Sequence, residues 1–339
     1  MIVVMKPGAS EDQVQHVIDL VREYGLKDHV IRGTDRTVVA CIGDKRMVDK
    51  GAIENAPMVE RIVPILAPYK MASTEVKKTK TRIEIGPERF PIGGPKVGVI
   101  AGPCAVESEE QILRIADAVK SAGAVALRGG AYKPRTSPYA FQGLREDGLK
   151  ILAKAREQTG LAVVTEVISL EHVERVAEYA DVLQIGARNM QHYPLLEAMG
   201  SAGKPVLLKR GMSATLDEWL LAAEYVINAG NPNVILCERG IRTYEDHVRN
   251  TLPLASVPAL NSMTHLPVIV DPSHGTGHAY MVPPMCRAAI AAGADGLILE
   301  CHNDPEHAMS DGAQSITPAA LTDLMPVLRR IAQALGRDA

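Results

Sequence analysis

Eight short apolar runs, separated by stretches with the pattern of amphipathic helices, are the feature that most constrains the fold of this chain. Each run is rich in β-branched and aliphatic residues, which is typical of strands that are buried on both faces. In chain order the runs are VGVIAG, AVALRG, LAVVTE, DVLQIG, PVLLKRG, VILCERG, PVIVDPS and GLILEC. Strands that alternate with helices in this way predict a (β/α)8 TIM barrel over residues 95–339.

A doubly wound open sheet is the alternative for such an alternation. We favour the barrel because no glycine-rich dinucleotide fingerprint follows the first run, and because polar residues end nearly every run. The active sites of such barrels are built at the carboxyl ends of the strands. The polar residues that follow the eight runs are therefore the candidate site residues.

Residues 1–66 show a separate pattern of strands and helices in the order βαββαβ, which is that of a ferredoxin-like domain. The expected strands are MIVVMK, HVIRG, TVVACIG and VERIVPIL, and the expected helices cover residues 10–24 and 47–55. Residues 67–94 are rich in lysine and threonine and end in a possible hairpin. We expect them to form a linker and a lid hairpin.

Composition excludes several classes of protein. The chain has 339 residues, 46% of them hydrophobic, and a net charge of -3, so it has ample material for a large core and no excess of basic residues for nucleic acid. No apolar run reaches the roughly 18 residues that a membrane-spanning helix needs, and no signal peptide is recognisable. The five cysteines are widely spaced and form no CxxC pair, so reduced thiols are expected. We therefore expect a cytoplasmic protein that binds neither membranes nor nucleic acid.

Cations follow several of the predicted strands. Because so many like charges around one rim repel one another, they indicate a strongly anionic ligand such as a phosphorylated substrate. Arginine suits phosphate and carboxylate bidentately, whereas lysine acts as a point charge or a proton donor. For any one of these cations taken alone, such as Arg210, an ordinary solvated or ion-paired group is the better explanation. The cations at the strand ends are Arg128, Lys133, Arg188, Lys209, Arg210 and Arg239.

The first, seventh and eighth strands are followed by a different set of side chains, namely Cys104, His274, Glu300 and Asp311. This mixture of sulfur, nitrogen and oxygen donors suits a divalent transition metal. A lone histidine or cysteine is as often a packed core residue, but these three strands are neighbours when the barrel closes. Four compatible donors together indicate a metal site. Asp271 could either orient a neighbouring side chain or cap the turn after its strand.

Several motifs together resemble one enzyme family. They are IAGPCAVES, LRGGAYKPRTSPYAFQG, LQIGARNMQ, LLKRGM, CERGIRTYE, VDPSHGTGH and ECHNDPEHAMSDGAQS. The chain resembles 3-deoxy-D-arabino-heptulosonate-7-phosphate (DAHP) synthases, and in particular the subfamily with an N-terminal ferredoxin-like regulatory domain. The resemblance implies a cytoplasmic, homotetrameric transferase that condenses phosphoenolpyruvate with erythrose 4-phosphate as the first step of the shikimate pathway. It also implies feedback inhibition by tyrosine or phenylalanine bound to the N-terminal domain.

The resemblance also assigns roles to residues. It implies the same metal ligands, Cys104, His274, Glu300 and Asp311, with Mn²⁺ favoured and Fe²⁺, Co²⁺, Zn²⁺ or Cd²⁺ as alternatives. The implied catalytic residues are Lys133, which would protonate the new alkoxide, Glu166, which would help to deliver water, and His274. The implied substrate-binding residues are Arg128, Lys133, Pro134, Arg135, Thr136, Ser137, Ala187, Arg188, Lys209 and Arg239.

Three other functions compete with this one. A 3-deoxy-octulosonate 8-phosphate synthase acting on arabinose 5-phosphate shares the fold, but typically has an asparagine-containing segment where this chain has Pro134-Arg135-Thr136. A Schiff-base aldolase would use Lys133 or Lys209. A non-catalytic sensor of aromatic amino acids would lack a ligand or a phosphate-binding residue, and none is missing from the sequence.

Overall fold

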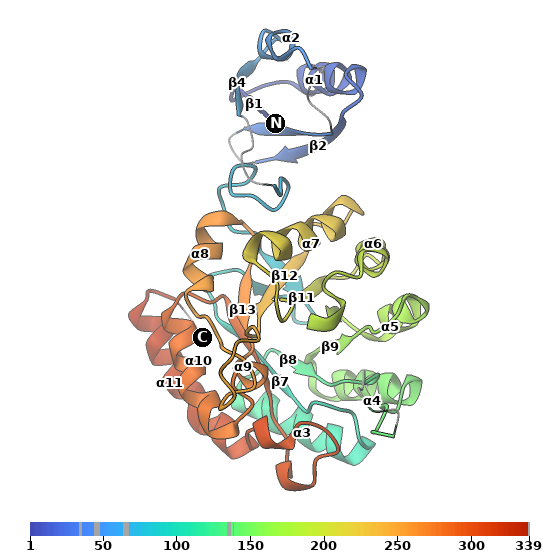
Figure 1. Cartoon of the computed structure of the whole chain (residues 1–339), viewed down its shortest axis with the longest axis vertical. Coiled ribbons are helices and arrows are strands. Elements are labelled where there is room, and N and C mark those ends of the chain that lie inside the picture. The colour runs from blue at the N-terminus through green and yellow to red at the C-terminus, as the bar shows by residue number, and fades with distance from the viewer. Residues whose placement is uncertain (34–35, 44–47, 64–67, 134–136, 138, 338–339) are drawn as a thin grey trace. The chain divides into compact units, whose positions relative to one another are not determined.

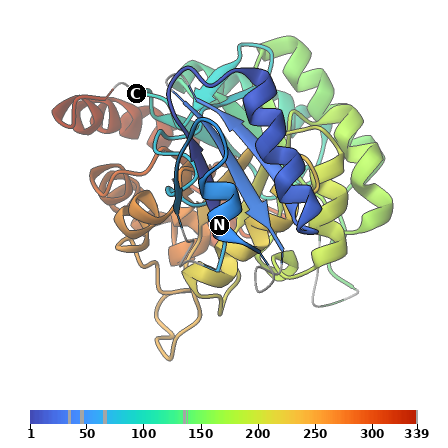
Figure 2. The ribbon, with the colours of Figure 1, turned by 90° about the horizontal axis from the view of Figure 1, so that it is seen from above.

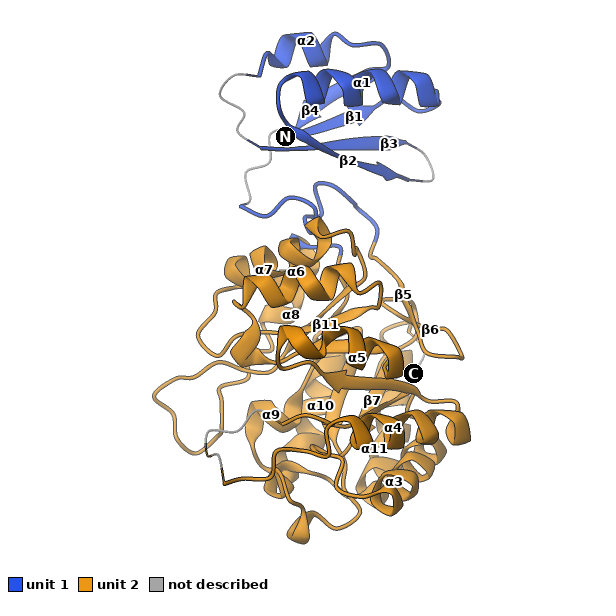
Figure 3. Ribbon diagram, turned by 90° about the vertical axis from the view of Figure 1, so that its right-hand side faces the viewer, with its two compact units in different colours: residues 1–79, 263–265 blue, residues 80–262, 266–339 orange. Residues whose placement is uncertain are grey.

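The structure is a computed structural model that describes residues 1–33, 36–43, 48–63, 68–133, 137 and 139–337. The chain divides into two compact units (Figure 3). The first contains residues 1–79 together with 263–265, and the second contains residues 80–262 and 266–339. Each unit is described by itself.

The second unit is a closed barrel of eight parallel strands in the order β10-β11-β12-β13-β14-β7-β8-β9, which confirms the predicted barrel (Figure 1). Each strand is almost wholly buried, which explains why the sequence shows continuous apolar runs instead of an alternating pattern. The strands are β7 (Gly98–Gly102), β8 (Ala126–Arg128), β9 (Ala162–Glu166), β10 (Val182–Ile185), β11 (Val206–Lys209), β12 (Val234–Glu238), β13 (Val268–Val270) and β14 (Gly296–Glu300).

Helices surround the barrel and pack their apolar faces on it (Figure 1). Local sequence signals fix their ends: the Ser108 side chain caps the first of them, and Thr215 with Glu218 forms a capping box on another. The helices are α3 (Glu109–Ala122), α4 (Glu146–Thr159), α5 (Val173–Tyr179), α6 (Tyr193–Ser201), α7 (Leu216–Asn228), α8 (Ser256–Met263), α9 (Pro272–Thr276), α10 (Val282–Ala291) and α11 (Pro318–Ala334).

A hairpin of β5 (Ile83–Ile85) and β6 (Phe90–Ile92) precedes the barrel. Its isoleucines belong to the same apolar cluster as the inward-facing residues of the barrel strands. The backbone at Gly86 lies against Ala162, the first residue of β9, and Phe90 lies against Gly98, the first residue of β7. The hairpin that the sequence predicts as a lid therefore covers the amino-terminal end of the barrel.

The first unit has the predicted βαββαβ order, and its antiparallel sheet has the strand order β2-β3-β1-β4. Helices α1 and α2 lie on one face of this sheet (Figures 2 and 3). Apolar residues at helical spacing in α1, such as Val14, Val17 and Val21, form the core against the strands. The elements are β1 (Ile2–Met5), α1 (Glu11–Glu23), β2 (Lys27–Arg32), β3 (Thr37–Ile42), α2 (Lys50–Glu54) and β4 (Val59–Val63).

All five cysteines carry free, buried thiols, as the sequence predicts. Among the helices that the structure describes, none is both long and apolar enough to span a bilayer.

Candidate active site and metal site

A pocket rich in cations lies at the carboxyl ends of the barrel strands. Seven cationic side chains line it, against two carboxylates, so its electrostatic potential favours an anionic ligand. The polar and charged side chains of its lining are Arg128, Lys133, Glu166, Gln184, Arg188, Lys209, Arg239, Arg242, Arg249, Asn250, His274 and Asp311.

Most of the residues that the sequence identifies as site residues meet in this pocket, including Ala187 in its wall. Cys104 and Glu300 are buried just beyond the lining, in contact with Asp311 and His274 respectively. Ser137 is exposed and, in the described part of the chain, takes no part in the pocket. Pro134, Arg135 and Thr136 lie outside the described residues.

Arg210 points elsewhere, as expected for this residue taken alone. It is buried, and its guanidinium forms an ion pair of 2.8 Å with Glu238 and donates a hydrogen bond to the carbonyl oxygen of Ala214. Two further cations, Arg242 and Arg249, also line the pocket, and sequence reasoning missed both of them. Both lie in the long connection after β12, where the strand-end rule gives no position. Arg242 is part of the CERGIRTYE motif, which was the available signal.

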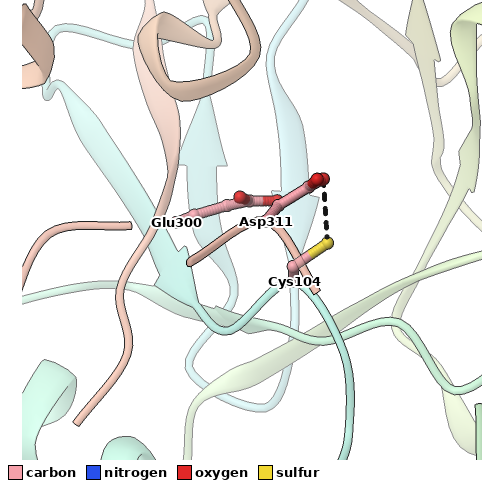
Figure 4. A group of neighbouring side chains, drawn as sticks. All are labelled: Cys104, Glu300 and Asp311. Carbon is pink, nitrogen blue, oxygen red and sulfur yellow. Dashed lines mark hydrogen bonds between the residues drawn. The ribbon is translucent and has the colours of Figure 1, made fainter. Parts of the chain in front are cut away.

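Three of the four proposed metal donors converge on one point. The sulfur of Cys104 and one carboxylate oxygen each of Glu300 and Asp311 lie within 4.8 Å of one another (Figure 4). They meet because β14 pairs with β7, so that residues following the two strands are neighbours. The fourth, His274, comes from α9, and its Nε2 lies 3.4 Å from Oε1 of Glu300.

The chemistry of this donor set fits a divalent cation. His274 Nδ1 lies 2.7 Å from the Asp271 carboxylate, so Nδ1 carries the proton and donates it, and the Nε2 lone pair faces Glu300. Two acceptor atoms 3.4 Å apart without a proton between them form an arrangement that a cation would stabilise. Thiolate, imidazole and carboxylate together are typical ligands of transition metals.

Burial and neighbouring charges set the protonation of these donors. Burial, together with the charge of Glu300, raises the pKa of the Cys104 thiol to about 11. Burial lowers the pKa of His274, which keeps the ring neutral. Burial also disfavours the Asp311 carboxylate, but Arg249 and His274 overcome this and hold its pKa at about 2. Cys104 is therefore the donor that carries a removable proton at neutral pH.

Lys133 connects the metal donors with the pocket. Its Nζ donates to the carbonyl oxygen of Cys104 at 2.9 Å and lies 3.0 Å from the sulfur of the same residue. Ser310 Oγ lies 3.1 Å from that sulfur on another side. An ammonium group in this position could donate a proton to an oxygen atom held near the metal donors.

Asp271 is fully buried at the centre of the site. Its Oδ1 accepts the backbone N–H of His274, and its Oδ2 lies near both the His274 ring and Nζ of Lys209. Burial disfavours its charge, but His274, Lys209 and Arg128 hold the pKa of Asp271 well below its ordinary value. Asp271 thus caps the turn and also orients its neighbours, so both possibilities that the sequence leaves open are realised.

The cations of the pocket differ in their partners. Arg128 pairs with Glu300 at 2.9 Å, but its buried Nε has no hydrogen-bond partner among the residues that the structure describes. In the described part of the chain, Arg188, Arg239 and Arg242 form no ion pair with a carboxylate, although Arg239 is 5% exposed. Burial lowers the pKa of Arg239. Arg239 is therefore a buried cation without a carboxylate partner in the described part of the chain, which indicates that its counter-charge belongs to the ligand.

Glu166 enters the pocket from the end of β9. Gln184 Nε2 donates to its Oε2 at 3.3 Å. The carboxylate lies directly over Gly186, where a side-chain Cβ would stand 2.0 Å from Glu166 Oε1. The absence of a side chain at Gly186 therefore gives Glu166 its position.

Comparisons with known proteins agree with the fold and identify the family of the chain. A profile of the DAHP synthetase I family matches residues 76–336, and a profile of the DAHP synthase ferredoxin-like domain matches residues 1–67. Phospho-2-dehydro-3-deoxyheptonate aldolase of Thermotoga maritima is 48% identical over 336 residues, which is 99% of each chain. A 2-dehydro-3-deoxyphosphooctonate aldolase of Koribacter versatilis is 33% identical over 72% of this chain and 94% of its own length.

Solved structures give the same result. The crystal structure of the T. maritima DAHP synthase superimposes with a TM-score of 0.79 at 47% identity, covering 99% of this chain and 98% of the other. A truncated form of the T. maritima enzyme matches 80% of this chain and 98% of its own, with a TM-score of 0.75 and 46% identity. Enzymes of this family are generally metal-dependent, and Cys104, Glu300 and Asp311 form a possible metal site. The chain belongs to the DAHP synthetase I family and is an enzyme of the DAHP synthase type, with a ferredoxin-like domain at its amino terminus.

Proposed function

We propose that this enzyme condenses phosphoenolpyruvate with erythrose 4-phosphate to give DAHP and inorganic phosphate. The observation that carries the proposal is the pocket itself. Three arginines without a carboxylate partner among the described residues, Arg188, Arg239 and Arg242, stand beside a cluster of sulfur, nitrogen and oxygen donors. Such a site suits two phosphorylated substrates, one of which has a carbonyl oxygen to be polarised.

In this proposal, phosphoenolpyruvate occupies the cationic part of the pocket. Arg188, Lys209 and Arg239 bind its anionic groups, while Arg128 and Lys133 lie on the side of the metal donors. Arg128 lines the pocket beside the metal donors, where its guanidinium is suited to a carboxylate or phosphate group. These contacts hold the enol carbon in place and neutralise the charge of the substrate.

Cys104, His274, Glu300 and Asp311 would hold a divalent metal ion, for which Mn²⁺ is our first choice and Fe²⁺, Co²⁺, Zn²⁺ or Cd²⁺ are alternatives. When bound there, such an ion acts as a Lewis acid toward the aldehyde oxygen of erythrose 4-phosphate. Asp271 holds His274 in the tautomer that presents Nε2 to this position.

In this proposal, Lys133 and Glu166 carry out the proton transfers of the reaction. As C3 of phosphoenolpyruvate bonds to the aldehyde carbon, Lys133 Nζ donates a proton to the oxygen of that carbon. Water adds to C2 and Glu166 takes one of its protons. The C2–O bond to the phosphate then breaks, the hydroxyl left on C2 becomes the ketone, and its proton leaves with the phosphate. Lys133 lies 3.0 Å from the Cys104 sulfur, which supports its role at the aldehyde oxygen, and Glu166 lines the same pocket.

Selectivity for the aldose separates this proposal from its nearest rival. The phosphooctonate aldolase of K. versatilis matches 72% of this chain at 33% identity, whereas the T. maritima DAHP synthase matches 99% of it at 48% identity. A steady-state assay of phosphate release with erythrose 4-phosphate or arabinose 5-phosphate tests the proposal. We expect erythrose 4-phosphate to be preferred in kcat/KM, and a preference for arabinose 5-phosphate would refute the substrate assignment. A product trapped by borohydride on Lys133 or Lys209 would favour a Schiff-base aldolase instead.

We also propose that residues 1–66 form the regulatory domain, which binds tyrosine or phenylalanine between subunits of a homotetramer. The match of residues 1–67 to the ferredoxin-like domain of DAHP synthases supports a regulatory ligand for this domain.

A further inference from the structure

Three side chains around the metal donors are not explained by the proposed reaction. They are Arg249 and Asn250, from the connection after β12, and Gln314, from the short 3-10 turn after Asp311. None of them is a metal donor, yet each contacts a donor residue or a neighbour of one.

Gln314 is 2% exposed, and both ends of its amide are used. Its Nε2 donates to Oε2 of Glu300 at 2.8 Å, and its Oε1 accepts from Nη1 of Arg249 at 2.7 Å. Gln314 therefore holds the Glu300 carboxylate through Oε2, while Oε1 of the same carboxylate faces His274. An amide is suited to this position because it donates at one end and accepts at the other.

Arg249 connects this amide with the second carboxylate. Its Nη1 lies 3.3 Å from Oδ2 of Asp311 in addition to its hydrogen bond to Gln314. One guanidinium group thus contacts one carboxylate donor directly and reaches the other through Gln314.

The backbone around Arg249 is fixed on the third donor. Its N–H donates to the carbonyl oxygen of Thr276 at 2.9 Å, and the Asn250 side chain donates to the carbonyl oxygen of His274 at 2.8 Å. The base of the Arg249 side chain is therefore anchored on the helix that carries His274, which limits how far its guanidinium can move.

We propose that Arg249 and Gln314 form an outer brace that fixes the orientation of the two carboxylate donors, Glu300 and Asp311, for a bound metal ion. The two are positioning residues, since neither is itself a donor. The inference rests on the proposed metal site, because the orientation of the carboxylates matters for binding only when a cation is held there. Loss of such supporting contacts typically weakens metal binding by about 10–100-fold.

Co²⁺ binding to the full-length, EDTA-stripped protein tests the brace without an activity assay. The variants are Arg249→Met and Gln314→Met, which remove the polar contacts and keep much of the volume. The dissociation constant and the visible spectrum, including the absorption of the cobalt–thiolate bond, are recorded for each. We expect each variant to bind Co²⁺ about 10–100-fold more weakly than the parent. The double variant should lose less affinity than the two single losses added together, because the two residues also contact each other.

A matched control is Arg156→Met. Like Arg249, Arg156 donates a hydrogen bond and pairs with a carboxylate, but at another place in the barrel. Its Nη1 donates to the backbone carbonyl oxygen of Tyr179 at 3.0 Å and lies 3.3 Å from the carboxylate of Asp181. It should lower thermal stability and leave Co²⁺ binding unchanged. If Gln314→Met does not fold, Arg249→Met decides, because the Arg249 side chain is 36% exposed.

The outcomes separate this inference from the metal site itself. The metal site is established if the parent protein binds Co²⁺ with a thiolate absorption that the Cys104→Ser variant lacks. If Arg249→Met then shows the parental affinity and spectrum, the brace alone is overturned. Additive losses in the double variant would also overturn it. Parent protein that binds no Co²⁺ would overturn both proposals.

Discussion

The carboxylate of Asp271 lies 2.6 Å from the ammonium group of Lys209, and both groups are buried between the cation-rich pocket and the metal donors. The same carboxylate oxygen lies 2.7 Å from the ring of His274. One buried charge therefore orients a residue of each half of the proposed site, so a change at Asp271 should affect both halves.

We expect Asp271→Asn to weaken Mn²⁺ binding by about 10–100-fold and to lower kcat at saturating metal, because the neutral amide releases Lys209 and no longer holds the His274 tautomer. The measurements are Mn²⁺ titration and steady-state kinetics. The control is Asp295→Asn. The Asp295 carboxylate also pairs with a lysine, since Nζ of Lys80 lies 2.7 Å from its Oδ2, but Asp295 precedes β14 and so lies at the other end of the barrel. Parental metal affinity and kcat in Asp271→Asn would contradict this role.

Gly186→Ala tests the position of Glu166. The added Cβ would stand 2.0 Å from Glu166 Oε1, so the carboxylate must move, whereas the backbone at Gly186, with φ of -68°, accepts alanine. Displacement of a proton-transfer group by about 1 Å can lower kcat by about 100-fold. The same substitution in a Glu166→Gln background should have little further effect. A fully active Gly186→Ala enzyme, or an undiminished loss in the Glu166→Gln background, would refute the role of Glu166.

Metal binding at pH 7 should release about one proton. The pKa of Cys104 is raised to about 11, so the thiol is protonated below that pH, while the lowered pKa values of His274, Glu300 and Asp311 leave the other donors without a removable proton. Because binding requires the thiolate, affinity should rise with pH, by about tenfold per unit near neutrality. Calorimetry in HEPES and in Tris measures the release. Identical enthalpies in the two buffers, or a release that persists in Cys104→Ser, would contradict it.

Removal of residues 1–66 should leave an active barrel that tyrosine and phenylalanine no longer inhibit. The barrel belongs to a compact unit that begins at residue 80 and has its own apolar core, so we expect it to fold without residues 1–66. Circular dichroism would verify the fold, and initial rates with each amino acid would give the result. Inhibition that persists in the truncated protein would place the effector elsewhere.

Sequence patterns predicted the parts of this molecule that depend on repetition. Buried strands give apolar runs, and the barrel rule then places Arg128, Lys209 and His274 at one rim. The same rule cannot place a residue within a long connection, so Arg249 was missed although it contacts Asp311. The sequence also shows a hairpin within residues 67–94, but nothing local specifies which end of the barrel it covers.

The detailed geometry of the donors depends on contacts between distant segments. Asp311 adopts a left-handed backbone conformation, with φ of 54°, which is rare outside glycine and follows from no local pattern. Likewise, only the folded chain shows that the two oxygens of Asp271 have different partners. Sequence reasoning proposed the metal donors, and the tertiary structure shows the contacts that would orient them.

The central claim is that this pocket joins phosphoenolpyruvate to erythrose 4-phosphate with the help of a metal ion held by Cys104, His274, Glu300 and Asp311. The most direct test is phosphate release from the two substrates by EDTA-treated enzyme, before and after addition of Mn²⁺. We predict that release depends on erythrose 4-phosphate, is abolished by EDTA and returns with Mn²⁺ in the parent but not in His274→Ala. Release that survives EDTA, or that returns equally in His274→Ala, would contradict the account.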